Sequence, residues 1–263
     1  MTALISRGAH QPLAPVVATL TALQDRHGAS SLQGLVPGLV ALTPEPAGGW
    51  CSASDLKVTD LLAAAARRWQ AQPHAAAALA WKCYSYWLAL PAVLGFAGSR
   101  RVPLMTPDHV LVRVSDHQPF LTLALRSPVT AVLATDPIVA TDAPGLLIVE
   151  DEEELLGVLR RSLVDAHLDP MLDDLRRHVH IGRRTLWGSV ASGVAYGLSR
   201  AADSLPGPTL DIAHRLLTAL DADELVDLSD RQGGGLDIQR RTCCLAFTLP
   251  TPKVCTTCCI RGH

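Results

Sequence analysis

Five of the seven cysteines in this chain of 263 residues lie within seventeen residues near its C-terminal end. Cys243 and Cys244 are adjacent, ten residues follow, Cys255 and Cys258 stand three apart, and Cys259 comes directly after. Packing gives little reason to gather thiols in one terminal segment, whereas thiolates are preferred ligands of zinc and of iron–sulfur clusters. We therefore interpret the segment as a metal site, and this constrains its fold more than any other feature of the sequence.

The spacing of the cysteines predicts a reversal of the chain. Cys244 and Cys255 are eleven residues apart, and an extended chain of that length would span about 36 Å. Ligands of one centre must converge, so the chain has to double back between them. The prolines and lysine of 250–253 predict the turn, and 245–249 predicts a short strand leading into it. Cys255 and Cys258 can point the same way from one tight turn.

The adjacent pair Cys243-Cys244 favours iron–sulfur over zinc. Neighbouring side chains of a strand face opposite sides, so both can ligate only from a kinked backbone. The two irons of a cluster are separated, so their ligands can lie further apart than the four ligands of one tetrahedral zinc. Zinc ribbons usually combine two C-x2-C segments. The spacing therefore favours a [2Fe–2S] cluster, with structural zinc as the alternative.

The spacing CC-x10-C-x2-C resembles that of the FhuF-type ferric siderophore reductases, and the surrounding residues are similar to that family at 240–245 (RRTCCL), 249–250 (LP) and 253–255 (KVC). A softer similarity lies at 184–191 (RTLWGSVA), which resembles a Leu-Trp-Gly segment ahead of the cluster domain in the family and in the related C-terminal region of siderophore synthetases. The resemblance implies a [2Fe–2S] cluster on Cys243, Cys244, Cys255 and Cys258. The family commonly has proline after the last of these cysteines, where this chain has Cys259. Either Cys258 or Cys259 is then the fourth ligand, and the spacing favours Cys258.

The resemblance implies a cytosolic ferric siderophore reductase. Hydroxamates and similar oxygen chelators bind the hard Fe(III) ion tightly, and reduction to Fe(II) loosens the complex. A [2Fe–2S] cluster passes single electrons. No nicotinamide or flavin fingerprint is visible in the sequence, so we expect a separate electron-donor protein. The expected substrate is an imported ferric siderophore, with the hydroxamate type favoured.

Two other classes of function stay open. One is an iron–sulfur sensor or electron-transfer adaptor, and the other is a siderophore-pathway binding protein whose tail holds structural zinc. No basic helix-turn-helix is visible, and the net charge of −2 argues against general nucleic-acid binding. Visible absorption of the purified protein distinguishes a cluster from zinc.

Charge is unevenly distributed along the chain. From residue 238 onward there are four basic residues and no acidic one, which leaves −6 for the rest of a chain with net charge −2. Cations such as Arg240 and Arg241 would raise the potential of an anionic cluster and steer an acidic donor towards it, and the alternative is a solvated basic tail. Arg183, Arg184 and Trp187 are further candidates for contact with substrate or donor. The alternative there is a core tryptophan beside solvated arginines.

Composition indicates a cytoplasmic protein without a membrane span. The N-terminal residues contain no apolar segment typical of a signal peptide. The longest uncharged apolar run, 83–98, is too short to cross a bilayer and contains Pro91. Cysteines in the cytoplasm stay reduced. We expect the isolated Cys51 and Cys83 to be small buried hydrophobic side chains.

The expected fold class is α+β, mostly helical, with a small antiparallel β-sheet and a C-terminal iron–sulfur tail. Three parts are predicted: an N-terminal α+β region (1–149) that includes a possible substrate-binding part, a helical region (150–237) and the cluster-binding tail (238–263). Apolar spacing and end signals predict helices at 13–26, 60–69, 74–98, 171–180, 184–202 and 210–220, with a further helix starting in the acidic run 150–154. Alternation predicts a hairpin of 110–114 with 120–125, and further strands at 131–135 and 146–149. We expect Ser54 and Asp55 to cap the second helix, and 233–235 (GGG) to form a hinge-like break.

Overall fold

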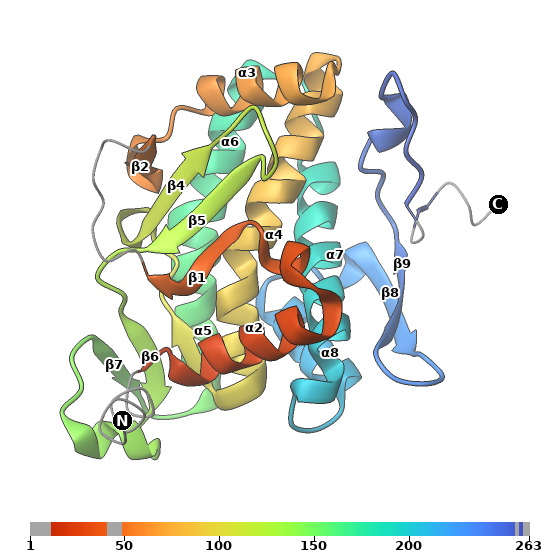
Figure 1. Cartoon of the computed structure of the whole chain (residues 1–263). Coiled ribbons are helices and arrows are strands. Elements are labelled where there is room, and N and C mark those ends of the chain that lie inside the picture. The colour runs from red at the N-terminus through yellow and green to blue at the C-terminus, as the bar shows by residue number, and fades with distance from the viewer. Residues whose placement is uncertain (1–11, 41–48, 256–257, 260–263) are drawn as a thin grey trace.

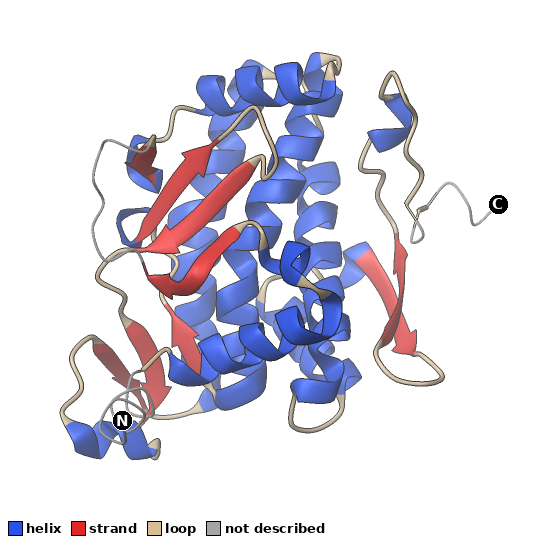
Figure 2. Ribbon diagram, viewed as in Figure 1, coloured by secondary structure: helices blue, strands red, loops and turns tan. Residues whose placement is uncertain are grey.

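The computed structural model describes residues 12–40, 49–255 and 258–259, and its architecture is α+β and mostly helical, as predicted. Helices form the centre of the molecule, strands cover one side, and the C-terminal hairpin and tail lie along the other (Figures 1 and 2). The α-helices are α2 (Ala14–His27), α3 (Val58–Trp69), α4 (Pro73–Ser99), α5 (Glu152–Arg160), α6 (Asp169–His178), α7 (Arg183–Ala201) and α8 (Thr209–Ala219). Short 3-10 turns join them at η1 (Ala29–Leu32), η3 (Ala53–Asp55), η4 (Pro107–His109), η5 (Pro137–Thr141), η7 (Ala202–Ser204) and η8 (Asp223–Leu225).

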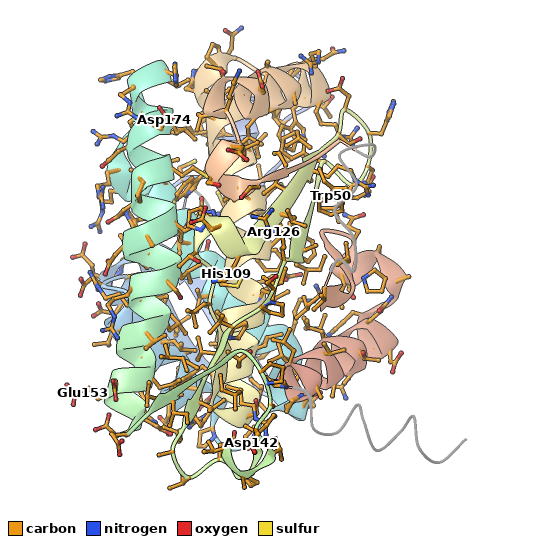
Figure 3. All side chains as sticks on the ribbon, turned by 90° about the vertical axis from the view of Figure 1, so that its left-hand side faces the viewer. Trp50, His109, Arg126, Asp142, Glu153 and Asp174 are labelled. Atoms are coloured by element: carbon orange, nitrogen blue, oxygen red, sulfur yellow. The ribbon has the colours of Figure 1, made fainter. Side chains whose placement is uncertain are left out.

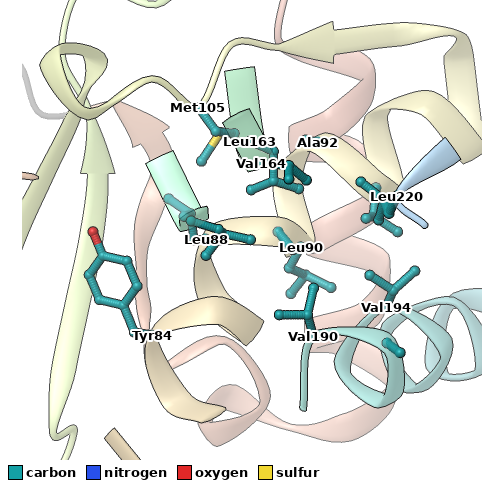
Figure 4. Packing of buried hydrophobic residues seen from close by; sticks show 14 of the residues in the cluster. Tyr84, Leu88, Leu90, Ala92, Met105, Leu163, Val164, Val190, Val194 and Leu220 are labelled. Atoms are coloured by element: carbon teal, nitrogen blue, oxygen red, sulfur yellow. The ribbon is translucent and has the colours of Figure 1, made fainter. Parts of the chain in front are cut away.

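Helix α4 is the central element of the core. The helix has Pro73 in its first turn, where a backbone N–H has no hydrogen-bond partner within the helix. Buried apolar side chains lie on nearly all faces of the helix, as is typical of a helix inside a core. It packs along α7, where Trp81 Nε1 donates a hydrogen bond to the carbonyl of Leu186 over 2.8 Å. Side chains of the two helices interdigitate in the interior (Figure 4), where Leu90 lies beside Val190.

The strands form three small sheets. One has the order β1 (Leu35–Val40), β5 (Leu121–Leu125), β4 (Val110–Val114), β2 (Trp50–Ser52); the second has β3 (Arg101–Pro103), β6 (Thr130–Leu133), β7 (Leu146–Val149); the third pairs β8 (Val226–Asp230) with β9 (Leu236–Arg240). The predicted hairpin is confirmed, since β4 and β5 pair antiparallel with Val110 opposite Leu125. The first two sheets are mixed, because β1–β5 and β6–β7 pair in parallel, and the third sheet is antiparallel.

A long helix on the outside of the molecule combines three segments. It begins at the predicted acidic run, where Asp151 accepts a hydrogen bond from the N–H of Glu154. A π-helical segment, η6 (Arg161–Leu168), joins α5 to α6 without a break. Figure 3 shows this helix along one edge of the molecule, with Glu153 near its beginning and Asp174 near its end.

Three local predictions are wrong. Ser54 and Asp55 lie in the separate turn η3, and the residue that precedes α3 is Lys57, which makes no side-chain cap. The glycines at 233–235 do not form a hinge but the turn of the β8–β9 hairpin, where all three have positive φ of 92°, 103° and 78°. Residues 245–249 do not form a strand: Leu245 takes a left-handed conformation and starts the 3-10 turn η9 (Ala246–Thr248).

One large core joins the regions predicted as 1–149 and 150–237. Its buried apolar side chains run from Leu13, just before α2, to Ile238 in β9. A second, small cluster joins Leu79 of α4 to Cys244, Ala246 and Leu249 of the tail. The tail is therefore attached where α3 ends and α4 begins. Within the described ranges, no helix has the length and apolar character needed to cross a bilayer.

Candidate metal centre

Strand β9 fixes the tail against α7. Its side chains alternate, with Leu236, Ile238 and Arg240 buried and the two residues between them exposed. At one end, the N–H of Leu236 donates to Ser199 Oγ over 2.8 Å. At the other end, Arg240 Nη2 donates to Ser189 Oγ over 3.2 Å. The residues that precede the cysteines are thus held along one face of a buried helix.

The Leu-Trp-Gly segment of α7 meets the residue just before the first cysteine. A Cβ atom on Gly188 would lie 1.8 Å from Oγ1 of Thr242, so only glycine admits this close approach. Thr242 is 7% exposed and is followed directly by Cys243. The two sequence segments that resemble the family, far apart along the chain, are therefore in contact in the structure.

The predicted reversal of the chain is present in the tail. After η9, the N–H of Lys253 donates to the carbonyl of Ala246 over 3.0 Å, which closes the loop. The N–H of Cys258 donates to the carbonyl of Cys255 over 3.2 Å, as expected for one tight turn. Gln239 Nε2 on β9 donates to the carbonyl of Cys258 over 3.3 Å.

This reversal brings the two cysteine segments within electrostatic range of each other. Cys244 is among the groups that act on the pKa of Cys255, after burial, and Cys243 is among those that act on the pKa of Cys259, also after burial. Cys258 is 5% exposed and lies near both Cys255 and Cys259. Across the described residues, no three His, Cys, Asp or Glu side chains form a ready-made metal site. Cys258 and Cys259 therefore both stay candidates for the fourth ligand.

Several groups act on the pKa of Cys244. Burial raises its pKa, but the backbone N–H of Ala246 and the positive charges of Lys82 and Arg240 outweigh burial, so its pKa lies below the usual value. Burial and the neighbouring Cys244 raise the pKa of Cys255.

The cysteines outside the tail have a different environment. Burial raises the pKa of Cys83 to about 11, and burial followed by nearby acidic residues raises the pKa of Cys51. Both are partly buried and pack against the core, in line with the structural role predicted for them.

Arg240 is the last residue of β9 and Arg241 follows it, and the two arginines have different surroundings. Arg240 is 3% exposed, and its charge lowers the pKa of Cys244. Arg241 is exposed, and its Nε donates to Asp227 over 3.0 Å. Arg240 has no surface that a donor protein can touch, and Arg241 is already paired with a carboxylate.

The substrate contacts predicted in α7 have partners within the protein. Arg183 pairs with Asp169, and Arg184 pairs with Glu224, both at 2.5 Å. Trp187 is 9% exposed and belongs to the core. The geometry matches the alternative of a core tryptophan beside surface arginines.

Sequence reasoning missed Lys82. This side chain favours the thiolate forms of both Cys244 and Cys255 from the facing helix α4. Its signal was available, since it is the only Lys, Arg, Asp or Glu in the 27 residues of α4. Gly188 and Ser189 were noted as part of a motif, but their contacts with the tail required the structure.

The body of the chain decides the family. Residues 80–225 match the family model described as ferric iron reductase FhuF-like transporter, and this range is more than half of the chain. The chain belongs to this FhuF-like family. The match runs from α4 to η8 and ends before Cys243, so membership in the FhuF-like family does not depend on the cysteine motif. A comparison with curated proteins gives no match.

The tail of this FhuF-like chain offers sulfur donors, which suit iron–sulfur clusters and zinc and do not suit hard oxygen-seeking cations. Arg240 provides a buried positive charge beside the thiols, and its Nε has no hydrogen-bond partner in the described part of the chain. A negatively charged group next to Arg240 would satisfy this unpaired charge.

Proposed function

We propose that this FhuF-like protein is a ferric siderophore reductase, which reduces chelated Fe(III) by one electron and releases Fe(II). The observation that carries the proposal is the meeting of C-terminal thiols beside a buried cation, on a body that belongs to a ferric iron reductase-like family. Cys243, Cys244 and Cys255, with Cys258 or Cys259, would hold a [2Fe–2S] group, which supplies a one-electron redox centre when bound.

The residues of this chain have three tasks in the proposed reaction. The close contact of Thr242 with Gly188, together with the β8–β9 hairpin, keeps the cysteine segment against helix α7. The turn closed by Lys253 and Ala246 brings the second cysteine segment back to the first. Lys82 and Arg240 favour the thiolate form of Cys244, which is the form that binds metal.

The substrate and the donor follow from the chemistry of iron. Fe(III) is held tightly by oxygen chelators, and Fe(II) is held more weakly, so one electron is enough to release the ion. The electron comes from a separate donor protein, and we expect a hydroxamate siderophore as the preferred substrate. We expect the reaction in the cytoplasm, because thiols stay reduced there.

The test begins with the purified protein under anaerobic conditions. Iron and sulfide are quantified, the protein is reduced with dithionite, and excess reductant is removed. Ferric hydroxamates and other ferric chelates are then added together with a ferrous chelator. We expect about one Fe(II) to be trapped for each electron that a reduced cluster releases. The visible absorption lost on reduction should return at the same rate as Fe(II) appears.

Cys51→Ser is the matched control for this test, because Cys51 is a partly buried thiol outside the tail. It should keep its iron and its activity, whereas Cys244→Ser should lose both. A reduced protein that ferric siderophores reoxidise no faster than free ferric chelates do would rule out the reductase and favour an adaptor or sensor. A colourless protein that contains zinc would favour a binding protein with a structural metal.

A further inference from the structure

Arg240 is a buried positive charge without a carboxylate partner in the described residues. Only 3% of its surface is exposed, and it takes part in no ion pair with a described carboxylate. Its only side-chain hydrogen bond there joins Nη2 to Ser189 Oγ over 3.2 Å, and its Nε has no partner. A buried charge without a partner is strongly unfavourable, so a fold that keeps one has another source of compensation.

Arg101 is less deeply buried than Arg240 and shows the usual compensation of such a charge by a carboxylate, although its Nη1 has no partner among the described residues. Arg101 is bound by Asp136 through two hydrogen bonds of 2.7 and 2.8 Å, with side-chain exposures of 12% and 9%. Such a bidentate carboxylate is the usual partner of a buried guanidinium. Arg240 instead ends β9, three residues before Cys243, and its neighbour Gln239 is hydrogen-bonded to the carbonyl of Cys258. The thiols of Cys244, Cys255 and Cys259 lie within the electrostatic range of its charge.

The alternation of β9 explains how Arg240 reaches this position. Leu236, Ile238 and Arg240 share the inner face of the strand, so the guanidinium enters the interior beside α7. Ser189 lies one residue after the glycine that admits Thr242. The same turn of α7 therefore positions both the backbone before Cys243 and the charge beside the thiols.

We propose that Arg240, positioned by Ser189, is the internal counter-cation of the thiolate-bound iron centre and raises its reduction potential, whereas its neighbour Arg241 does not. The inference rests on the proposed function, because it needs a redox-active centre on these thiols. An added electron makes such a centre more negative, and a fixed cation in a low-dielectric interior stabilises that state. Arg241 is exposed and already compensated by Asp227, so solvent screens its charge.

The test compares reduction potentials of Arg240→Gln and Arg241→Gln, two neighbouring changes that each remove one positive charge. For Arg240→Gln we expect the ratio of reduced to oxidised protein at a fixed solution potential to fall about tenfold, a shift of about 59 mV for one electron. For Arg241→Gln we expect a change of less than about twofold, since exposed charges are screened. Arg240→Lys should recover most of the potential, and Ser189→Ala should shift it in the same direction as Arg240→Gln by a smaller amount.

A second measurement uses thermal unfolding with and without metal. Metal-free Arg240→Gln should unfold at the same temperature as the metal-free wild type or at a higher one, because an uncompensated buried charge is removed. The stabilisation gained on loading should be smaller than in the wild type. Arg241→Gln should change both states equally.

The outcomes separate this inference from the proposed function. Equal potential shifts for Arg240→Gln and Arg241→Gln, or no shift for either, would overturn the role of Arg240 while leaving the cluster in place. A lower unfolding temperature of metal-free Arg240→Gln would also contradict it, because Arg240 would then be compensated without metal. A wild-type protein without iron and sulfide would overturn the proposed function itself, and the inference with it.

Discussion

At the scale of single residues, His167 is held neutral in the core. It is 3% exposed and lies in the π-helical segment η6. Its Nδ1 donates to the carbonyl of Met105 over 2.5 Å, which leaves Nε2 to accept a hydrogen bond from the Tyr84 hydroxyl over 2.6 Å. Burial lowers the pKa of His167 to about 4.

This histidine predicts that stability falls in mild acid. The unfolded chain has the ordinary histidine pKa of about 6.5. Below that pH the histidine is therefore protonated in the unfolded state but still neutral in the folded state. The neutral His167 contributes fully to the free energy of unfolding above about pH 7. As the pH falls from 6.5 towards 4, the free energy of unfolding should decrease by at most about 3 kcal/mol. Urea unfolding between pH 4.5 and 8 measures it.

His167→Gln should flatten this pH dependence, because the titrating group is gone. Tyr84→Phe should lower stability at neutral pH by about 1–3 kcal/mol, since Nε2 then loses its donor. A wild-type slope that survives in His167→Gln would assign the effect to another group.

Prediction at the residue scale also concerns the fourth ligand. Spacing favours Cys258, whereas Cys259 lies within the electrostatic range of Cys243. We expect Cys258→Ser to lose more of the bound iron and visible absorption than Cys259→Ser, because a lost thiolate leaves iron under-coordinated. Loss in Cys259→Ser alone would move the ligand by one residue. Loss only in the double variant would mean that the two thiols interchange.

At the scale of elements, α7 serves as the platform on which the tail rests. Gly188 receives Thr242, and Ser189 receives Arg240. Gly193, one and a half turns further along the same helix, lies beside Tyr86, where a Cβ atom would have an ordinary contact of 3.5 Å. Two glycines in one helix therefore differ sharply in the space around them.

This difference gives a matched pair of variants. Gly193→Ala should be neutral or stabilising by up to about 1 kcal/mol, the usual gain of alanine over glycine within a helix. Gly188→Ala should be destabilising by about 1–3 kcal/mol, because Thr242 has to move, and it should weaken metal loading through the displaced Cys243. Denaturant unfolding and iron content measure the two effects. Equal behaviour of both variants would mean that Thr242 moves away without cost.

At the scale of the whole molecule, the tail and the body are packed unequally. The body has one large core, while the segment that contains the cysteines adds only the small cluster around Leu79 and Cys244. Phe247 and Val254 in this segment are 41% and 45% exposed. Segments with few buried apolar contacts open locally at little cost in free energy. Metal bound to the thiols would therefore contribute much of the stability of the tail.

Limited proteolysis measures this contribution. Trypsin should cleave after Lys253, which is exposed, about tenfold more slowly in the loaded protein than in the metal-free protein, because bound ligand stabilises only the closed tail. Cleavage after the exposed Arg126, far from the thiols in the sequence, is the control within the same digest and should not change. Mass spectrometry separates the two products. An unchanged rate at Lys253 would mean that metal does not hold the tail closed.

The sequence by itself determined the elements whose signals are local. The helices α2, α4 and α7, the hairpin of β4 with β5, and the acidic start of α5 followed from apolar periodicity and from residues at their ends. The reversal between the two cysteine segments followed from their spacing and from the prolines between them. The family was also correctly inferred from motifs in the tail and α7, although its match lies in the body of the chain.

Only the tertiary structure decided which of the similar residues share the site. Nothing local distinguishes Arg240 from Arg241, but the register of β9 buries one and exposes the other. Lys82 and Ser189 come from helices distant in the sequence, and packing brings them to the tail. The glycines at 233–235 were mispredicted because their role as a turn depends on the pairing of β8 with β9. Residues 245–249 were mispredicted because Ala246 in that segment is bound by Lys253 from the returning chain. The electrostatics of the thiols follow from these long-range contacts, and no local pattern in the chain records them.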